Sequence, residues 1–165
     1  MRSGVSIRAA AAGDMDAVAA LFRDYAAALG VDLSYQGFAA ELAGLPGAYA
    51  APDGALLIAV TVTGEAVGCA GVRKLAEPGT CEMKRLYARP EARGTGVGRA
   101  LAVAAIEAAA ARGYIHMRLD TLPAMTAAQA LYRELGFVTV PPYYDSPIQG
   151  TIFMEKSLGS AAEPP

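Results

Sequence analysis

A glycine-rich turn between a strand and a helix constrains this chain more than any other feature. The segment Arg93-Gly94-Thr95-Gly96-Val97-Gly98 follows a strand-like run ending at Ala88 and opens an alanine-rich helix that reaches about Arg112. The first amides of a helix have no intrahelical partner, and the helix dipole adds partial positive charge there. Glycines let the backbone approach an anion without Cβ atoms in the way. The turn therefore predicts a binding site for a phosphate or pyrophosphate group.

The spacing of the glycines disfavours two familiar nucleotide-binding motifs. The turn lacks the Gly-Lys-Ser/Thr ending of a P-loop. Counted from Gly94 or from Gly96, the last glycine of G-x-G-x-x-G would fall on Arg99 or on Leu101. The turn also lies too far along the chain for the first strand-to-helix turn of a Rossmann domain. The predicted anion site therefore belongs to another fold.

Hydrophobic periodicity and turn signals give the order of elements. Strands are expected at residues 5–10, 55–62, 66–74, 80–88, 114–121, 137–144 and 151–157. Helices are expected at about 14–29, 34–44, 97–112 and 125–135, the first of them capped by Asp14. The order β-α-α-β-β-β-α-β-α-β-β predicts an α/β fold with a mixed, mostly antiparallel sheet of about seven strands and helices on both faces. Residues 1–158 are expected to form a single domain, and residues 159–165 a disordered tail.

Composition and charge disfavour several functional classes. Hydrophobic residues make up 54% of the chain and charged residues 18%, which is typical of a well-packed globular protein. The formal net charge of −2 argues against a nucleic-acid or anionic-membrane partner. No membrane-spanning run or signal peptide is evident, so we expect a cytoplasmic protein. Cys69 and Cys81, without a C-x-x-C pair, and the single His116 give too few ligands for a metal site, and none is expected.

The glycine turn also matches R-x-x-G-x-G, and here the chain resembles the GNAT superfamily of acetyl-CoA-dependent N-acyltransferases. The resembling stretches are CEMKRLYARPEARGTGVGRALAVAAIEAAAARGY at residues 81–114 and LYRELGF at residues 131–137. With the elements around them, these stretches cover most of residues 5–156. The chain is most similar to the bacterial members of the family that act on small molecules. The resemblance implies that acetyl-CoA is the cosubstrate. It also implies that the fourth and fifth strands splay apart into a slot for the pantetheine arm.

The cofactor contacts that this resemblance implies are mostly contacts of the backbone. The main chain of Leu86, Tyr87 and Ala88 would bind the pantetheine amides, often beside a β-bulge. The residues that would surround the pyrophosphate are Arg93, Gly94, Thr95, Gly96, Val97, Gly98 and Arg99. Two positions depart from the family pattern: Ala88 stands where valine is common, and Met125 stands where many members carry an asparagine that contacts the cofactor.

Direct transfer of an acetyl group to an amine needs a base and a proton donor, because the amine must lose a proton and the thiolate must leave. Glu82, in the fourth strand, is the expected catalytic base, as is a glutamate at a similar place in the histone-acetylating branch of the superfamily. It could instead anchor the substrate amine or pair with Lys84 on the same strand face, leaving the base role to a relayed water. Tyr132, in the family's L-Y-x-x-x-G-F element, is the expected donor to the thiolate, although it could also serve only as a core residue.

The acceptor is less well specified. In this fold the first two helices and the loop between the last strands build the pocket. The candidates there are Tyr25, Tyr35, Arg73, Arg85, Tyr143, Tyr144 and Asp145. The Pro141-Pro142-Tyr143-Tyr144 segment indicates a small, rigid pocket. We therefore expect acetyl transfer to a primary amine of a small molecule. The alternatives are a protein lysine or N-terminal acetyltransferase and a non-catalytic acyl-CoA-binding module. Acyl chain length and assembly as a homodimer stay open.

Overall fold

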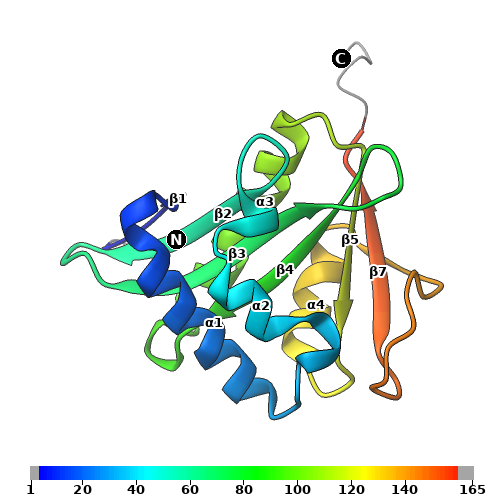
Figure 1. The fold of residues 1–165 in the computed structure, drawn as a ribbon, viewed down its shortest axis with the longest axis horizontal. Coiled ribbons are helices and arrows are strands. Elements are labelled where there is room, and N and C mark those ends of the chain that lie inside the picture. Colours follow the sequence, from blue (N-terminus) through cyan, green and yellow to red (C-terminus); the bar gives the residue numbers. More distant parts are fainter. Residues whose placement is uncertain (1–3, 160–165) are drawn as a thin grey trace.

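The computed structural model describes residues 4–159, and within them a seven-stranded mixed sheet forms the centre of the fold (Figure 1). The strands lie in the order β1-β2-β3-β4-β5-β7-β6, and all neighbours are antiparallel except β4 and β5. The strands are β1 Val5–Ala9, β2 Ala55–Thr61, β3 Ala66–Lys74, β4 Thr80–Ala88, β5 His116–Thr121, β6 Val138–Val140 and β7 Ile152–Ser157. The helices are α1 Met15–Leu29, α2 Phe38–Ala43, α3 Val97–Ala111 and α4 Thr126–Glu134. The predicted fold class and element order are confirmed.

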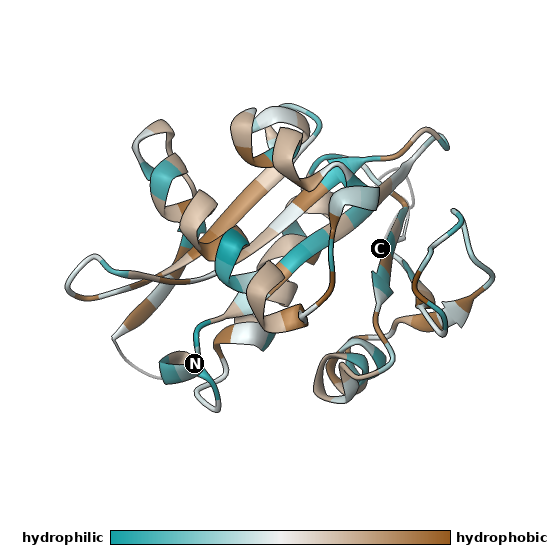
Figure 2. Ribbon diagram, turned by 60° about the horizontal axis from the view of Figure 1, so that its bottom comes forward, coloured by the Kyte–Doolittle hydropathy of each residue, from teal (hydrophilic) through white to brown (hydrophobic). Residues whose placement is uncertain are grey.

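Helices cover both faces of this sheet. In Figure 1, α1 and α2 lie on the near face and α3 and α4 lie behind the strands. Val18, Leu21 and Phe22 recur at helical spacing on α1 and pack against the sheet in one buried cluster. Leu101 and Ala105 of α3 belong to a larger cluster on the opposite face. Figure 2 shows the hydrophobic residues concentrated along the central strands, because these strands are covered on both sides.

The strands β4 and β5 separate partway along their length. They pair only where Thr80–Glu82 faces His116–Arg118, whereas β4 continues to Ala88. A β-bulge shifts the register between β3 and β4, and Arg85 at this irregularity has a φ of 61°. Helix α4 is visible between the diverging strands in Figure 1. The slot and the bulge that the resemblance implies are therefore both present.

Local details differ from the expectations. Strand β6 stops at Val140, because Pro141 and Pro142 cannot donate hydrogen bonds to a ladder. The second helical stretch is a 3₁₀ turn at Ser34–Gln36 followed by α2, with Gly37 between them. Asp14 does precede α1, but its side chain accepts hydrogen bonds from the Ala11 amide and from Arg8 instead of capping that helix.

The predicted C-terminal tail, apart from Gly159, lies outside the described residues. Between residues 4 and 159, no helix combines the length and the apolar character that a membrane crossing requires. The same part of the chain has no group of three or more His, Cys, Asp or Glu side chains arranged to hold a metal ion. What the fold does position is the slot between β4 and β5, with the glycine turn beyond the end of β4.

Candidate active site

The glycine turn presents free backbone amides at the start of α3. Gly94 and Gly96 have φ angles of 77° and 86°, which side chains other than glycine rarely tolerate. A Cβ atom at either position would meet no other atom within 4 Å, so the turn faces open space. The first intrahelical bond runs from Ala100 N to Gly96 O at 3.0 Å. The amides of residues 97–99 therefore precede the helical ladder, and they are suited to bind an anion.

Side chains tie this turn to the end of β4. The Arg93 Nε donates to the Ala88 carbonyl at 3.0 Å, and its guanidinium carbon lies 5.7 Å from the Tyr87 ring centroid. The Thr95 hydroxyl donates to the carbonyl of Ala92, and Val97 is buried in the core. The position of the turn relative to the slot is thus fixed by packing and by short hydrogen bonds.

Arg99 behaves differently from the rest of the turn. Its Nη1 lies 2.9 Å from the Glu134 Oε2 at the end of α4, and both side chains are more than half exposed. Exposed ion pairs of this kind contribute little to stability and exchange readily with solvent or ligands. Arg99 therefore lies in the first turn of α3 with a partner that does little to hold its side chain in place.

The main chain of Leu86, Tyr87 and Ala88 has one strand neighbour only. Tyr87 pairs with Cys69 and Ala88 pairs with Gly68 on β3, whereas the ladder to β5 ends at Glu82. Peptide groups that point toward β5 beyond this residue have no strand partner. They form one wall of the slot and can bind an extended chain of amides such as pantetheine.

A cavity in the slot brings together residues far apart in the sequence. Its lining consists of residues 83–86 of β4, Asp120 of β5, Met125 and Tyr132 around α4, and Tyr25 of α1. The predicted donor Tyr132 and the backbone wall at Leu86 therefore face the same space. Met125 contributes a thioether to this lining where many members of the resembling family carry an amide.

Tyr132 both packs in the core and faces the cavity. The residue is 6% exposed, and its ring centroid lies 5.8 Å from that of Phe137 in an edge-to-face arrangement. Burial raises the pKa of the Tyr132 hydroxyl above its usual value near 10. The phenol therefore holds its proton at neutral pH, which is the state that a proton donor needs. The two alternatives for Tyr132 are compatible.

Glu82 is buried and already has hydrogen-bond donors on both carboxylate oxygens. It is 1% exposed, its Oε1 accepts from Arg73 Nε at 2.8 Å, and the Tyr143 hydroxyl donates to its Oε2 at 2.5 Å. Lys84 Nζ lies 3.9 Å from Oε1. The expected pairing with Lys84 is thus secondary to the pairing with Arg73. A substrate amine or water that approaches Glu82 must share an oxygen with one of these donors.

Arg85 fixes α2 to the sheet beside the slot. Its Nε and Nη2 donate to the two carboxylate oxygens of Glu41 at 2.9 Å each, and its Nη1 donates to Gln36 Oε1 at 2.8 Å. Burial opposes the ionisation of Glu41, but its hydrogen bonds and charge interaction with Arg85 outweigh this effect and lower the pKa of Glu41. Arg85 therefore stabilises the wall of the pocket, and its donors are occupied by protein groups.

The loop between β6 and β7 covers the two carboxylates of the slot. Tyr143 donates to Glu82, and the adjacent Tyr144 donates to Asp120 Oδ2. Both rings pack edge-on against Phe153, at centroid distances of 5.2 and 5.1 Å. Of the predicted acceptor residues in this loop, only Asp145 is exposed.

Two residues of the site were missed or undervalued from the sequence. Asp120 was not considered, and Lys84 entered only as a partner of Glu82. The alternation of strand side chains gives the signal that was available: Arg118 and Asp120 share a face of β5, as Glu82 and Lys84 share a face of β4. The sequence alone does not show that β4 and β5 are neighbours in the sheet, which brings these side chains together.

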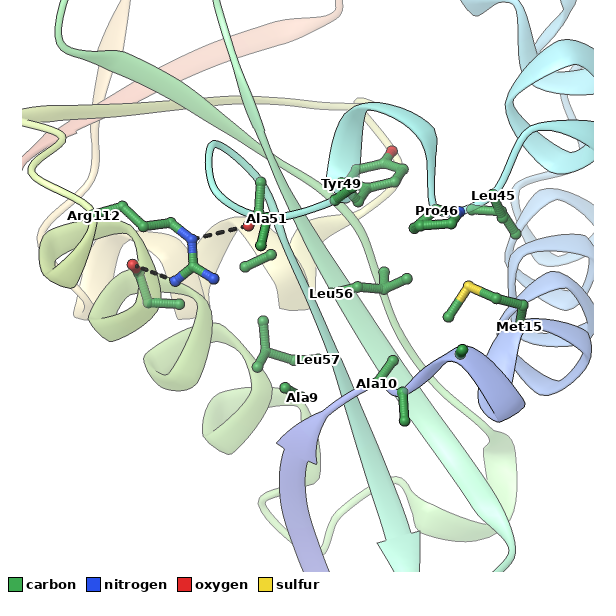
Figure 3. A pocket seen from close by; sticks show the side chains of 16 residues that line it. Ala9, Ala10, Met15, Leu45, Pro46, Tyr49, Ala51, Leu56, Leu57 and Arg112 are labelled. Atoms are coloured by element: carbon green, nitrogen blue, oxygen red, sulfur yellow. Dashed lines mark hydrogen bonds between the residues drawn. The ribbon is translucent and has the colours of Figure 1, made fainter.

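A wider pocket lies elsewhere, at the C-terminal end of α3, which is the end opposite the glycine turn (Figure 3). It has a volume of about 580 Å³ and is lined mainly by alanines and other apolar residues of β1, β2 and the loop before β2. The charged side chain in its lining is Arg112, whose Nε donates to Gly54 O and whose Nη1 donates to Ala108 O. The lining of this pocket contains no carboxylate and none of the residues expected to act in catalysis.

Known proteins match the chain along most of its length. The profile of the Acetyltransferase (GNAT) family matches residues 18–137. An uncharacterised N-acetyltransferase of Schizosaccharomyces pombe is 40% identical over 145 residues, which are 88% of this chain and 89% of that protein. The crystal structure of a Klebsiella pneumoniae protein assigned to the acyl-CoA N-acyltransferases has 32% identity and a TM-score of 0.69, covering 94% of this chain and 98% of that one. A Salmonella typhimurium structure with its cofactor acetyl-CoA has 23% identity and a TM-score of 0.67, covering 99% of both chains.

Proposed function

The chain belongs to the acetyltransferase (GNAT) family, and from this premise we propose that it moves an acetyl group from acetyl-CoA directly to a primary amine of a small molecule. Its enzyme class, N-acetyltransferase, follows from the family. One observation carries the finer proposal: Tyr132 lines a cavity together with Leu86, where the backbone of β4 has lost its β5 partner, and Arg93 of the glycine turn is hydrogen-bonded to Ala88 at the end of the same strand.

We propose that acetyl-CoA binds along this slot. The amides of residues 93–99 would hold the pyrophosphate, and the β5-facing peptide groups of residues 86–88 would hold the pantetheine arm. Open space at Gly94 and Gly96 supports the first contact, and the early end of the β4–β5 ladder supports the second. The acetyl-CoA in the Salmonella relative of the same fold is consistent with both.

In the proposed reaction, Glu82 takes a proton from the acceptor amine, directly or through a water. The amine nitrogen then forms a bond to the thioester carbonyl carbon, the carbon–sulfur bond breaks, and Tyr132 delivers a proton to the thiolate. No covalent enzyme intermediate is required. Tyr143 and Arg73 each donate to one oxygen of Glu82 and so hold its carboxylate in one orientation.

The closed loop supports a small acceptor over a protein. Tyr143 and Tyr144 anchor the loop onto Glu82 and Asp120, so the loop covers the face that carries these two carboxylates. A peptide substrate would need that face open as a groove.

The test of the proposed function is release of free CoA thiol from acetyl-CoA across a panel of amines. The panel contains amino acids, polyamines, aminoglycosides and a lysine peptide. We expect turnover with at least one small amine and no turnover with the peptide. Turnover confined to the peptide would assign the chain to the protein acetyltransferases.

A further inference from the structure

Lys84 is a buried lysine without a hydrogen bond. Its side chain is 4% exposed, and no described residue accepts a hydrogen bond from its Nζ. Its nearest anion, Glu82 Oε1, is 3.9 Å away and is already held by Arg73 at 2.8 Å. Burial lowers the pKa of Lys84, with the charge of Glu82 acting in the opposite sense. An ammonium in such a place is costly unless a ligand pairs with it.

The other cations around the slot have protein partners. Arg73 binds Glu82, and Arg85 binds Glu41 through two hydrogen bonds of 2.9 Å. Arg118 Nε and Nη2 bind Glu155 and Glu77 at 2.8 and 2.9 Å. Among the described residues, Lys84 is therefore the cation in the lining of the slot cavity that is not held by a hydrogen bond to a protein group.

Asp120 lines the same cavity and carries the opposite charge. Its Oδ2 accepts a hydrogen bond from Tyr144, and within residues 4–159 it has no salt bridge. It also lines a second cavity under α1, which shares Tyr25 and Met125 with the slot. Asp120 thus lies where the two cavities adjoin. The slot presents one ammonium, whose single close anion is Glu82 at 3.9 Å, and one carboxylate that has no salt bridge among the described residues.

We propose that the acceptor is an amino acid or a related amine that carries a carboxylate, with its carboxylate bound by Lys84 and its amino group beside Asp120. The proposal rests on the proposed function, because it names the substrate class of that site. A ligand with both charges satisfies both groups, whereas a plain amine leaves Lys84 unpaired and a polyamine adds charge of the wrong sign. Tyr132 lines this cavity too, so an amine beside Asp120 shares the cavity with the proposed proton donor, and Glu82, which does not line it, would act on the amine through a water.

The experiment compares matched acceptors with the full chain and saturating acetyl-CoA. Each of several amino acids is assayed against its primary amide and against the amine without the carboxyl group. We expect kcat/KM to be at least about tenfold higher for the amino acid, the effect of one well-placed charged contact. Equal or higher kcat/KM for the amides or the plain amines would overturn the proposal while leaving the proposed function intact.

Variants of Lys84 then locate the contact. Lys84→Met should raise KM for the amino acid at least about tenfold and change kinetics with the amide little, whereas Lys84→Arg should retain part of the preference. Lys74→Met, at an exposed lysine on β3, is the matched control and should behave as the wild type. A loss of kcat in Lys84→Met that is equal for both members of a pair would place Lys84 at the thioester and overturn the proposal.

Two further outcomes separate the hypotheses. If acetyl-CoA binds by calorimetry but no small amine releases CoA, both the proposed function and this inference fail. If Lys84→Met does not fold, as judged by its melting curve, the comparison of matched acceptors with the wild type still decides the question.

Discussion

The glycine turn beyond the end of β4 and the buried charges of Glu82, Lys84 and Asp120 on β4 and β5 are built in different ways. The turn consists of backbone amides at the start of a helix with open space in front of them. Such a turn requires little more than closely spaced glycines before the helix. The charged region uses side chains from β3, β4, β5 and the β6–β7 loop, and its two carboxylates accept hydrogen bonds from Arg73, Tyr143 and Tyr144.

This difference matches the two ligands, because acetyl-CoA is common to the family whereas the acceptor differs between its members. Backbone contacts tolerate changes of side chain, and they suit a cosubstrate that does not vary. Side-chain contacts in a buried cluster change with each substitution, and they suit an acceptor that does vary. Substitutions in the turn should therefore affect acetyl-CoA binding alone, and substitutions in the charged region should affect the acceptor and the chemical step.

Glu82→Gln should give the largest loss of activity. The change keeps the shape of the side chain and removes the base, so kcat/KM should fall by roughly 10²-fold or more. The acidic limb of the pH profile should also move or vanish, which an assay from about pH 5.5 to 9.5 would record. A lower melting temperature with an unaltered acidic limb would make Glu82 a structural residue and assign the base role to a water.

Tyr132→Phe should come next, with kcat lower by roughly 10²-fold, the low end for a general acid. Because burial raises the pKa of Tyr132, the hydroxyl is protonated throughout the neutral range, and the loss should be uniform across it. The KM for acetyl-CoA should change little, since the ring is retained. A variant within about twofold of the wild type would leave Tyr132 as a core residue only.

The fold and the turn could be predicted from the sequence because their signals are local. Periodicity and turn residues sufficed for the element order, and glycine spacing sufficed to place the turn at the start of α3. The spatial proximity of Lys84, Asp120 and Tyr143 could not be predicted. It depends on where β4 and β5 diverge and on how the loop between β6 and β7 folds back over them. The length of β6 was overestimated, although Pro141 and Pro142 gave a local signal for its end.

Gly96→Asp tests the turn by itself. It places a side chain at a φ of 86° and a negative charge in the proposed cradle, so affinity for acetyl-CoA should fall about tenfold, or about 1.4 kcal/mol. Gly113→Asp is a matched control, because Gly113 follows α3 at its other end with a φ of 88° and equally open surroundings. Equal affinity of the two variants by calorimetry would remove the pyrophosphate from the turn.

Tyr143→Phe should have the smallest effect and the most selective one. It removes the donor to Glu82 Oε2 and loosens the loop over the acceptor, so we expect KM for the acceptor to rise about threefold, less than one full hydrogen bond to a charged group would contribute. The KM for acetyl-CoA should not change, because no atom of Tyr143 lines the turn. Tyr114→Phe, which loses a hydrogen bond of 2.7 Å to Asp53 O at the other end of the sheet, is the control for stability alone. If Tyr143→Phe altered both KM values together, the two regions would be coupled, and the separation between a backbone site for the cosubstrate and a side-chain site for the acceptor would be wrong.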